Sequence, residues 1–317
     1  MSYLRSPGKP HFVVPFIALL LTCFASPPAH AEESAKSDPE RGRYLFRIAV
    51  SCGCHGDNLA GYKRGNPPTL PDAAPFGERF DGPFGSVPSS NITSDQETGI
   101  GGWSDEELIT GIRTGVRPDG APLFPIMPYP SYSGIADQDV RDLVAYLRTV
   151  PAVKNEVPAK QLNPPPPGVE PPPLPPLQKA PATAPTSPPE RRGEYLALSL
   201  AHCNICHSTT APDMTPLPGH YLAGNVMPVS GELALIPNIT PDEKTGIGSW
   251  SADDIAAFLK TGSKPNGTIA YGLMKDLIEK YGLKHLTDGD AKAIGLYLKT
   301  IPPVKYTPQV PPPPQKE

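Results

Sequence analysis

Cys203-Asn204-Ile205-Cys206-His207 places two thiols three residues apart, with a histidine directly after the second. This is the attachment spacing of a c-type haem, in which each sulfur adds to one vinyl group of the porphyrin. The next residue is then held beneath the ring, so that His207 becomes the proximal ligand of the iron. A redox dithiol and half of a zinc site also use Cys-x-x-Cys, but neither needs the adjoining histidine. We therefore expect a covalent haem at Cys203, Cys206 and His207.

The N-terminus predicts export from the cytoplasm. Arg5 and Lys9 precede a mostly apolar run from Phe12 to Phe24, and Ala29-His30-Ala31 offers a small-x-small cleavage pattern. The run is too short for a membrane anchor. We expect a signal peptide over residues 1–31 and a periplasmic mature protein.

Composition narrows the function classes. Of the five cysteines, Cys23 lies in the signal peptide, and the other four form two short pairs that are each followed by histidine. Haem attachment accounts for these pairs, whereas an even count in an exported protein would otherwise suggest disulfides. The signal peptide holds two of the 28 basic residues and none of the 32 acidic ones, which leaves the mature chain a net charge of −6. That charge argues against nucleic acid and against an anionic membrane surface as partners. Because no later stretch can span a bilayer, we expect membrane association only through a partner.

A second copy of the surrounding pattern lies upstream. Asn91–Ser104 matches Asn238–Ser251 at ten of fourteen positions. The motif Arg-Gly-x-Tyr-Leu begins at Arg41 in one copy and at Arg192 in the other, and both copies close on Tyr-Leu-x-Thr-x-Pro. Agreement in order at several separated places indicates two copies of one domain.

The domain boundaries follow from the proline content. Residues 158–189 hold 14 prolines in 32 positions, a density that neither helix nor sheet tolerates. We expect domains at 32–157 and 190–309, a proline-rich linker at 158–189 and a C-terminal tail at 310–317. A polyproline-like linker of this length reaches roughly 100 Å at about 3.1 Å per residue. It would let one domain dock on an electron donor while the other swings to an acceptor.

The local signals inside each copy are helical. Side-chain caps and apolar periodicity predict helices at residues 39–46, 105–112, 139–149, 252–259 and 290–300. Strand-like alternation is nearly absent. We therefore expect an all-α fold in which each small domain needs a large apolar ligand to complete its core, and haem supplies one.

The repeat also selects a second axial ligand for each iron. Met127 lies 24 positions after Trp103, and Met274 lies 24 positions after Trp250. A thioether is the usual sixth ligand in electron carriers, so we expect Met127 and Met274 to bind iron. Each tryptophan either packs against a haem edge or serves as a core aromatic residue at a helix start.

Other candidate ligands have no counterpart in the first copy. His220 and His285 are alternatives to Met274 as nitrogen ligands. The remaining methionines, Met214 and Met227, are expected to fill space in the core. His202, beside the haem motif, is expected to be a surface histidine.

The first haem site departs from the pattern. It is Cys52-Gly53-Cys54-His55, with one residue between the thiols instead of two. Three outcomes follow: two strained thioether bonds, one bond through Cys54 with Cys52 unused, or no haem. Retention of His55, Met127 and Trp103 favours a haem with His55 and Met127 as iron ligands.

The string Asn91-Ile-Thr-Ser-Asp-Gln-Glu-Thr-Gly-Ile-Gly-Gly-Trp-Ser104 resembles the haem domains of periplasmic multihaem cytochromes c, as do Met127-Pro-Tyr-Pro-Ser-Tyr132 and the closing Tyr-Leu-x-Thr-x-Pro. These include the cytochrome subunits of membrane-bound alcohol, aldehyde and gluconate dehydrogenases. The resemblance implies two tandem class I cytochrome c domains, two covalently attached haem c groups and His/Met ligation. It carries over onto Cys203, Cys206, His207 and Met274, and onto His55 and Met127. The shortened cysteine pair departs from the family.

We interpret the chain as an exported dihaem electron carrier between a dehydrogenase and the respiratory chain, rather than an enzyme. A haem enzyme, such as a dihaem peroxidase or a thiosulfate-oxidising cytochrome, is the alternative. It would need an exchangeable position on iron, against which the two equivalent methionines argue. A scaffold that tethers a dehydrogenase to the membrane is a third interpretation.

Overall fold

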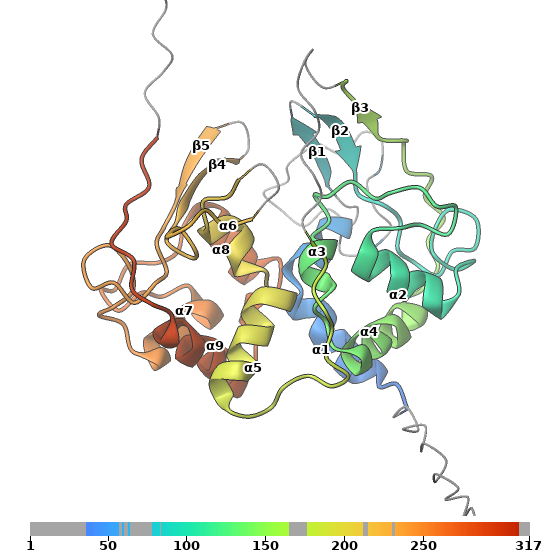
Figure 1. Cartoon of the computed structure of the whole chain (residues 1–317). Coiled ribbons are helices and arrows are strands. Elements are labelled where there is room, and N and C mark those ends of the chain that lie inside the picture. Colours follow the sequence, from blue (N-terminus) through green and yellow to red (C-terminus); the bar gives the residue numbers. More distant parts are fainter. Residues whose placement is uncertain are drawn as a thin grey trace, which may run out of the picture. The chain divides into compact units, whose positions relative to one another are not determined.

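The structure, a computed structural model, describes residues 36–56, 59, 63, 78–82, 84–164, 176–211, 215–229 and 232–310. Four predictions concern residues outside this set: the signal peptide, the assignment of Met214, the middle of the linker and nearly all of the C-terminal tail. The described part is mostly helical and contains a few short strands (Figure 1).

The helical elements, in chain order, are α1 (Pro39–Ile48), the 3-10 turn η1 (Val50–His55), α2 (Asp105–Thr114), α3 (Tyr129–Tyr132), α4 (Asp137–Thr149), α5 (Pro189–Tyr195), the π-helical turn η2 (Leu196–Leu200), α6 (Cys203–His207), α7 (Ala252–Thr261), α8 (Gly272–Glu279), the 3-10 turn η3 (Leu283–His285) and α9 (Asp288–Thr300). The strands are β1 (Arg79–Gly82), β2 (Gly85–Pro88), β3 (Gln161–Leu162), β4 (Asn225–Val229) and β5 (Glu232–Ile236).

The predicted starts of α1, α2 and α7 are confirmed, and each is capped by a side chain. Asp38 accepts hydrogen bonds from two backbone N–H groups of α1, and capping boxes at Ser104 and Ser251 start α2 and α7. The last helices, α4 and α9, begin two residues earlier than predicted, at Asp137 and Asp288. Acidic residues in the first turn favour that extension, because they face the positive end of the helix dipole.

In each half of the sequence, the first helix crosses the last at a glycine. A side chain on Gly42 of α1 would place its Cβ 1.9 Å from the carbonyl oxygen of Asp142 in α4. The same holds for Gly193 of α5 and the carbonyl oxygen of Ala293 in α9, again at 1.9 Å. These pairs lie against each other in Figure 1. The glycine of the Arg-Gly-x-Tyr-Leu motif is therefore explained, because only hydrogen fits between the helices.

Replacing Gly193 by alanine should lower the free energy of unfolding by about 1–3 kcal/mol or more, because α5 must move away from α9 to make room. Denaturant unfolding followed by circular dichroism measures this. Gly289→Ala in α9 is the matched control, since nothing lies within 4 Å of its Cβ position. An equal loss in both variants would contradict the steric explanation.

A buried asparagine fastens the end of each repeat to its middle. The side-chain amide of Asn91 donates to the Val153 carbonyl at 2.8 Å, and that of Asn238 donates to the Val304 carbonyl at 2.7 Å. Each asparagine also accepts from the backbone and hydroxyl of the threonine two residues later. The repeated Asn-Ile-Thr string thus fixes where the chain returns after the last helix.

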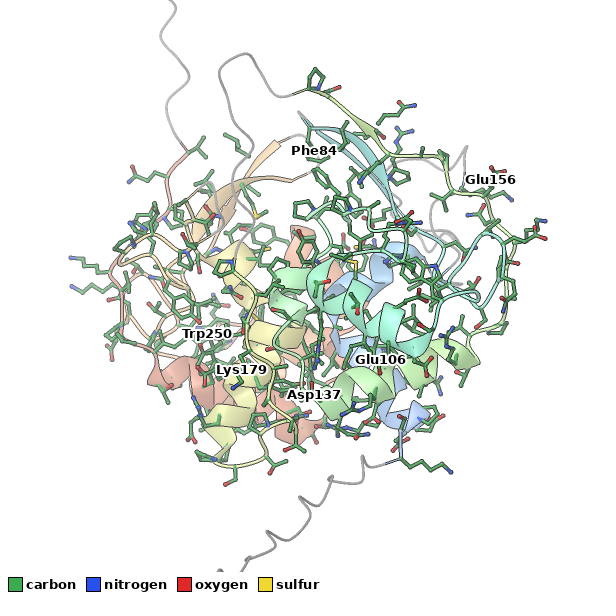
Figure 2. The ribbon with its side chains drawn as sticks, turned by 45° about the vertical axis from the view of Figure 1, so that its right-hand side comes forward. Phe84, Glu106, Asp137, Glu156, Lys179 and Trp250 are labelled. Carbon is green, nitrogen blue, oxygen red and sulfur yellow. The ribbon has the colours of Figure 1, made fainter. Side chains whose placement is uncertain are left out.

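The all-α expectation is incomplete, because short sheets are present. Strands β1, β2 and β3 form one antiparallel sheet, and β4 pairs with β5 in another. Their sequences lack regular alternation, and Pro88 and Pro228 interrupt them, so periodicity does not reveal them. Figure 2 shows Phe84 at the β1–β2 turn, where its ring packs on Phe124 with centroids 4.9 Å apart.

One hydrophobic cluster includes residues from both halves of the sequence. It combines the inner faces of α1 and α4, such as Leu45 and Val144, with those of η2 and α9, such as Leu200 and Ile294. Among the described residues, no helix has the length and apolarity needed to cross a bilayer.

Candidate haem sites

A cavity of about 1070 Å³ lies in the first half of the chain. Its lining includes His55 and Cys54 from η1 and Met127 from the loop before α3, together with Trp103. Apolar side chains of α2 and α4, among them Leu108, Ile112, Leu143 and Leu147, complete the wall. Two predicted iron ligands far apart in the sequence therefore face one apolar space.

Both motif histidines are oriented by a backbone carbonyl. The Nδ1–H of His55 donates to the Ser90 carbonyl at 2.7 Å, and that of His207 donates to the Pro237 carbonyl at 2.8 Å. Burial lowers the pKa of both imidazoles, so each ring is neutral near pH 7. A hydrogen bond at Nδ1 fixes the tautomer and leaves Nε2 as the nitrogen that can bind a metal.

The cysteines of the second site lie on α6 in a poorly solvated environment. Burial raises the pKa of Cys203 to about 12, and burial also raises the pKa of Cys206. Reactive dithiols have a lowered pKa, so these thiols do not fit a redox pair. Among the described residues, no group of three or more His, Cys, Asp and Glu side chains is placed to hold a metal ion.

The first motif has a different backbone. Val50–His55 forms a 3-10 turn, whereas Cys203–His207 forms an α-helix. Gly53 and Cys54 are half-buried there, and the side chain of Cys52 lies outside the described set. The shortened motif therefore still presents Cys54 and His55 at the cavity.

The other predicted residues are placed as follows. Met274 lies on α8 and packs against the hydrophobic core, as does Trp250, whose ring meets Phe258 edge-on. Met227 lies half-buried on β4. His220 packs edge-on against the ring of Tyr306.

The expectation that His202 is a surface histidine holds only in part, because the residue is half-buried. Its ring lies edge-on to Tyr132 with centroids 6.1 Å apart, and burial lowers its pKa to about 4. Tyr132 comes from the other half of the chain, so the local sequence gave no sign of this contact.

Sequence reasoning missed the cations beside the cavity. Arg117 and Lys160 line it, and the Arg117 guanidinium lies 5.6 Å from the centroid of the Trp103 ring. The equivalent residue in the second copy is Lys264, whose ammonium lies 5.4 Å from the Tyr271 ring. A basic residue before the repeated Pro-x-Gly was a signal that could have identified both positions. These cations suit the carboxylates of a haem.

Haem fits this cavity by the chemistry of its lining. An imidazole and a thioether are the ligands of c-type electron carriers, and both side chains border the same largely apolar space. Cys54 stands beside His55, as covalent attachment requires.

Comparison with known proteins agrees with a cytochrome c fold. The cytochrome c family model matches residues 39–151. The cytochrome c subunit of alcohol dehydrogenase (quinone) from Gluconobacter oxydans (strain 621H) is 32% identical over 305 residues, which cover 91% of this chain and 59% of that subunit. The gluconate 2-dehydrogenase cytochrome c subunit of Pantoea cypripedii is 34% identical over 285 residues, which cover 83% of this chain and 59% of that subunit. A diheme cytochrome c-type protein of Cereibacter sphaeroides is 31% identical over 301 residues, which cover 85% of this chain and 91% of that protein.

The mostly helical fold and the family match together define a c-type cytochrome. The chain belongs to the cytochrome c family, and it is an electron carrier related to the cytochrome subunits of dehydrogenases. Membership implies a covalently attached haem c. The chain spans only 59% of the length of the two dehydrogenase subunits.

Proposed function

We propose that the chain carries two haem c groups, one in each repeat, and passes electrons from a dehydrogenase on the periplasmic side of the membrane toward the respiratory chain. The domains are residues 32–157 and 190–309, with 158–189 between them. The observation that carries the proposal is the cavity that His55 and Met127 line together. Relatives named as dehydrogenase cytochrome subunits support the choice of donor.

Each ligand has a defined task in this proposal. When bound, the haem supplies an iron that gains and loses one electron. The carbonyls of Ser90 and Pro237 hold the imidazoles of His55 and His207 in one orientation, so neither ring needs to turn when the charge changes. Met127 and Met274 would supply the second protein ligand of each iron, and thioether ligation raises the reduction potential.

The apolar wall and the cysteines complete the proposed site. Side chains of α2 and α4 exclude water, which favours the less charged state of the centre. Cys54, Cys203 and Cys206 hold the haem by thioether bonds, and Cys52 forms a further bond if its sulfur reaches the ring. No acid–base or nucleophilic residue is required, because an electron moves without a bond being broken.

Intact mass of the exported protein tests this proposal. Two haem additions are expected, and alkylation under denaturing conditions then counts the thiols that remain. A colourless protein with no haem mass would refute the proposed function. Tight cyanide binding without a lag, by a protein with its full haem content, would favour the haem enzyme instead, since it reports an exchangeable iron position.

A further inference from the structure

The Arg-Gly-x-Tyr-Leu motif contains two residues that the haem sites do not use. The guanidinium of Arg41 donates to Asp139 on α4, with Nε 3.1 Å from Oδ1. The equivalent Arg192 donates to Asp290 on α9 through Nε and Nη2, at 2.9 and 2.8 Å. Each arginine therefore pairs with an aspartate of the last helix in its own repeat.

The motif tyrosines bind across to the other repeat. Tyr44 donates its hydroxyl proton to Asp290 at 2.6 Å, and Tyr195 donates to Asp139 at 2.8 Å. Each hydroxyl also accepts from a backbone N–H at the start of the same partner helix, Thr287 for Tyr44 and Ala136 for Tyr195. Two equivalent Arg–Asp–Tyr clusters result, related by exchange of the repeats.

The aspartate of each cluster is shielded from water, whereas Arg41 is 38% exposed. The side chain of Asp139 is 1% exposed, and those of Arg192 and Asp290 are 12% and 14% exposed. Burial, together with the hydrogen bond to Asp290, raises the pKa of Tyr44 to about 12, so its hydroxyl remains a donor. Removing a hydrogen-bond donor from a buried carboxylate destabilises the folded protein. In each cluster, one donor to the aspartate comes from the other repeat.

A second set of contacts joins the haem-attachment segments. Tyr281, after α8, lies against Gly53, where a Cβ would come within 2.5 Å of its ring, and its hydroxyl donates to Glu78. In the opposite direction, Tyr132 meets His202, directly before Cys203. Each repeat thus places a tyrosine against the attachment segment of the other repeat.

The described ends of the linker also lie on the first repeat. Asp137 donates its backbone N–H to the Pro181 carbonyl at 2.9 Å, and β3 pairs with β2. The expectation of a swinging tether disagrees with the contacts between the repeats, because a second domain that swings away would have to break them.

We propose that the two Arg–Asp–Tyr clusters and the covering tyrosines lock the repeats into one fixed pair, so that residues 158–189 connect the repeats without allowing them to swing. If the proposed function holds, electrons then cross between the haem sites at a constant separation through this interface.

Cutting the linker tests whether the two repeats stay associated, and the readout does not depend on haem. A protease recognition sequence is inserted between Gly168 and Val169 of the full chain, the purified protein is cut, and its pieces are followed by gel filtration. We expect the pieces to co-elute at micromolar concentration. Tyr44→Phe and Tyr195→Phe should each raise the dissociation constant of the two pieces about tenfold to hundredfold. This is the change expected when a hydrogen bond to a charged group is lost.

Two matched controls accompany these variants. Tyr271→Phe loses a hydroxyl from a tyrosine that is 80% exposed, and it should leave the dissociation constant unchanged. Gly282→Ala should separate the pieces, because the new Cβ would come 1.7 Å from the Arg47 carbonyl oxygen. Gly267→Ala is its control, since Gly267 also has a positive φ but nothing lies within 4 Å of its Cβ position. This control should leave the pieces together. The proposed interface would be refuted if the pieces without any substitution separated. It would also be refuted if Tyr44→Phe, like Tyr271→Phe, left the dissociation constant unchanged. Haem content by mass is scored separately, so failure of the proposed function is recognised independently.

Discussion

Replacing Met127 by alanine is expected to change the spectrum of one haem in two. Met127 borders the same cavity as His55, and an alanine side chain cannot reach a metal that His55 binds. Loss of the thioether leaves an iron with one protein ligand, so half of the haem signal should change from low-spin to high-spin and should bind cyanide readily. The reduction potential of that half should fall, because methionine ligation raises it.

Visible and electron paramagnetic resonance spectra, with a redox titration, measure this change in the purified protein. Met274→Ala should produce the same effect on the other half of the signal, and the double variant should convert all of it. Met227→Ala on β4 is the control and should leave both halves unaltered. An unchanged spectrum for Met127→Ala would mean that another group binds the first iron, and the proposed ligand set would fail.

The features predicted well from the sequence are those with local causes. Capping at Asp38, Ser104 and Ser251 is decided within a few residues, and these helices begin where predicted. The distance from Trp103 to Met127 was informative because the repeat supplied a second measurement of it. Met127 does face the same cavity as His55.

The features that the sequence did not reveal depend on contacts between distant segments. Tyr44 and Asp290 are 246 positions apart, and neither has a local partner that would indicate the pairing. The surroundings of His202 were not foreseen for the same reason, since its ring contacts Tyr132 of the other repeat. The short strands were missed because backbone pairing holds them, with little alternation of side chains.

The two attachment motifs should differ in how many cysteines they need. A 3-10 helix rises about 2.0 Å per residue and an α-helix about 1.5 Å, so two steps in η1 span about 4 Å, close to the about 4.5 Å of three steps in α6. The rotations differ, however: two 3-10 steps turn the chain by about 240°, against about 300° for three α-helical steps. A motif shortened by one residue therefore keeps the axial spacing and loses the angular match between its two positions.

Cys54, which keeps its place directly before His55, should consequently carry the first haem by itself. Cys54→Ala is expected to reduce the covalent haem count from two to one, whereas Cys52→Ala should leave it at two. Intact mass under denaturing conditions measures both. Replacing Cys203 and Cys206 together is the matched change in the second repeat and should also leave one haem. If Cys52→Ala lost a haem and Cys54→Ala kept both, the first attachment would run through Cys52, and the alignment of Cys54-His55 with Cys206-His207 would be wrong.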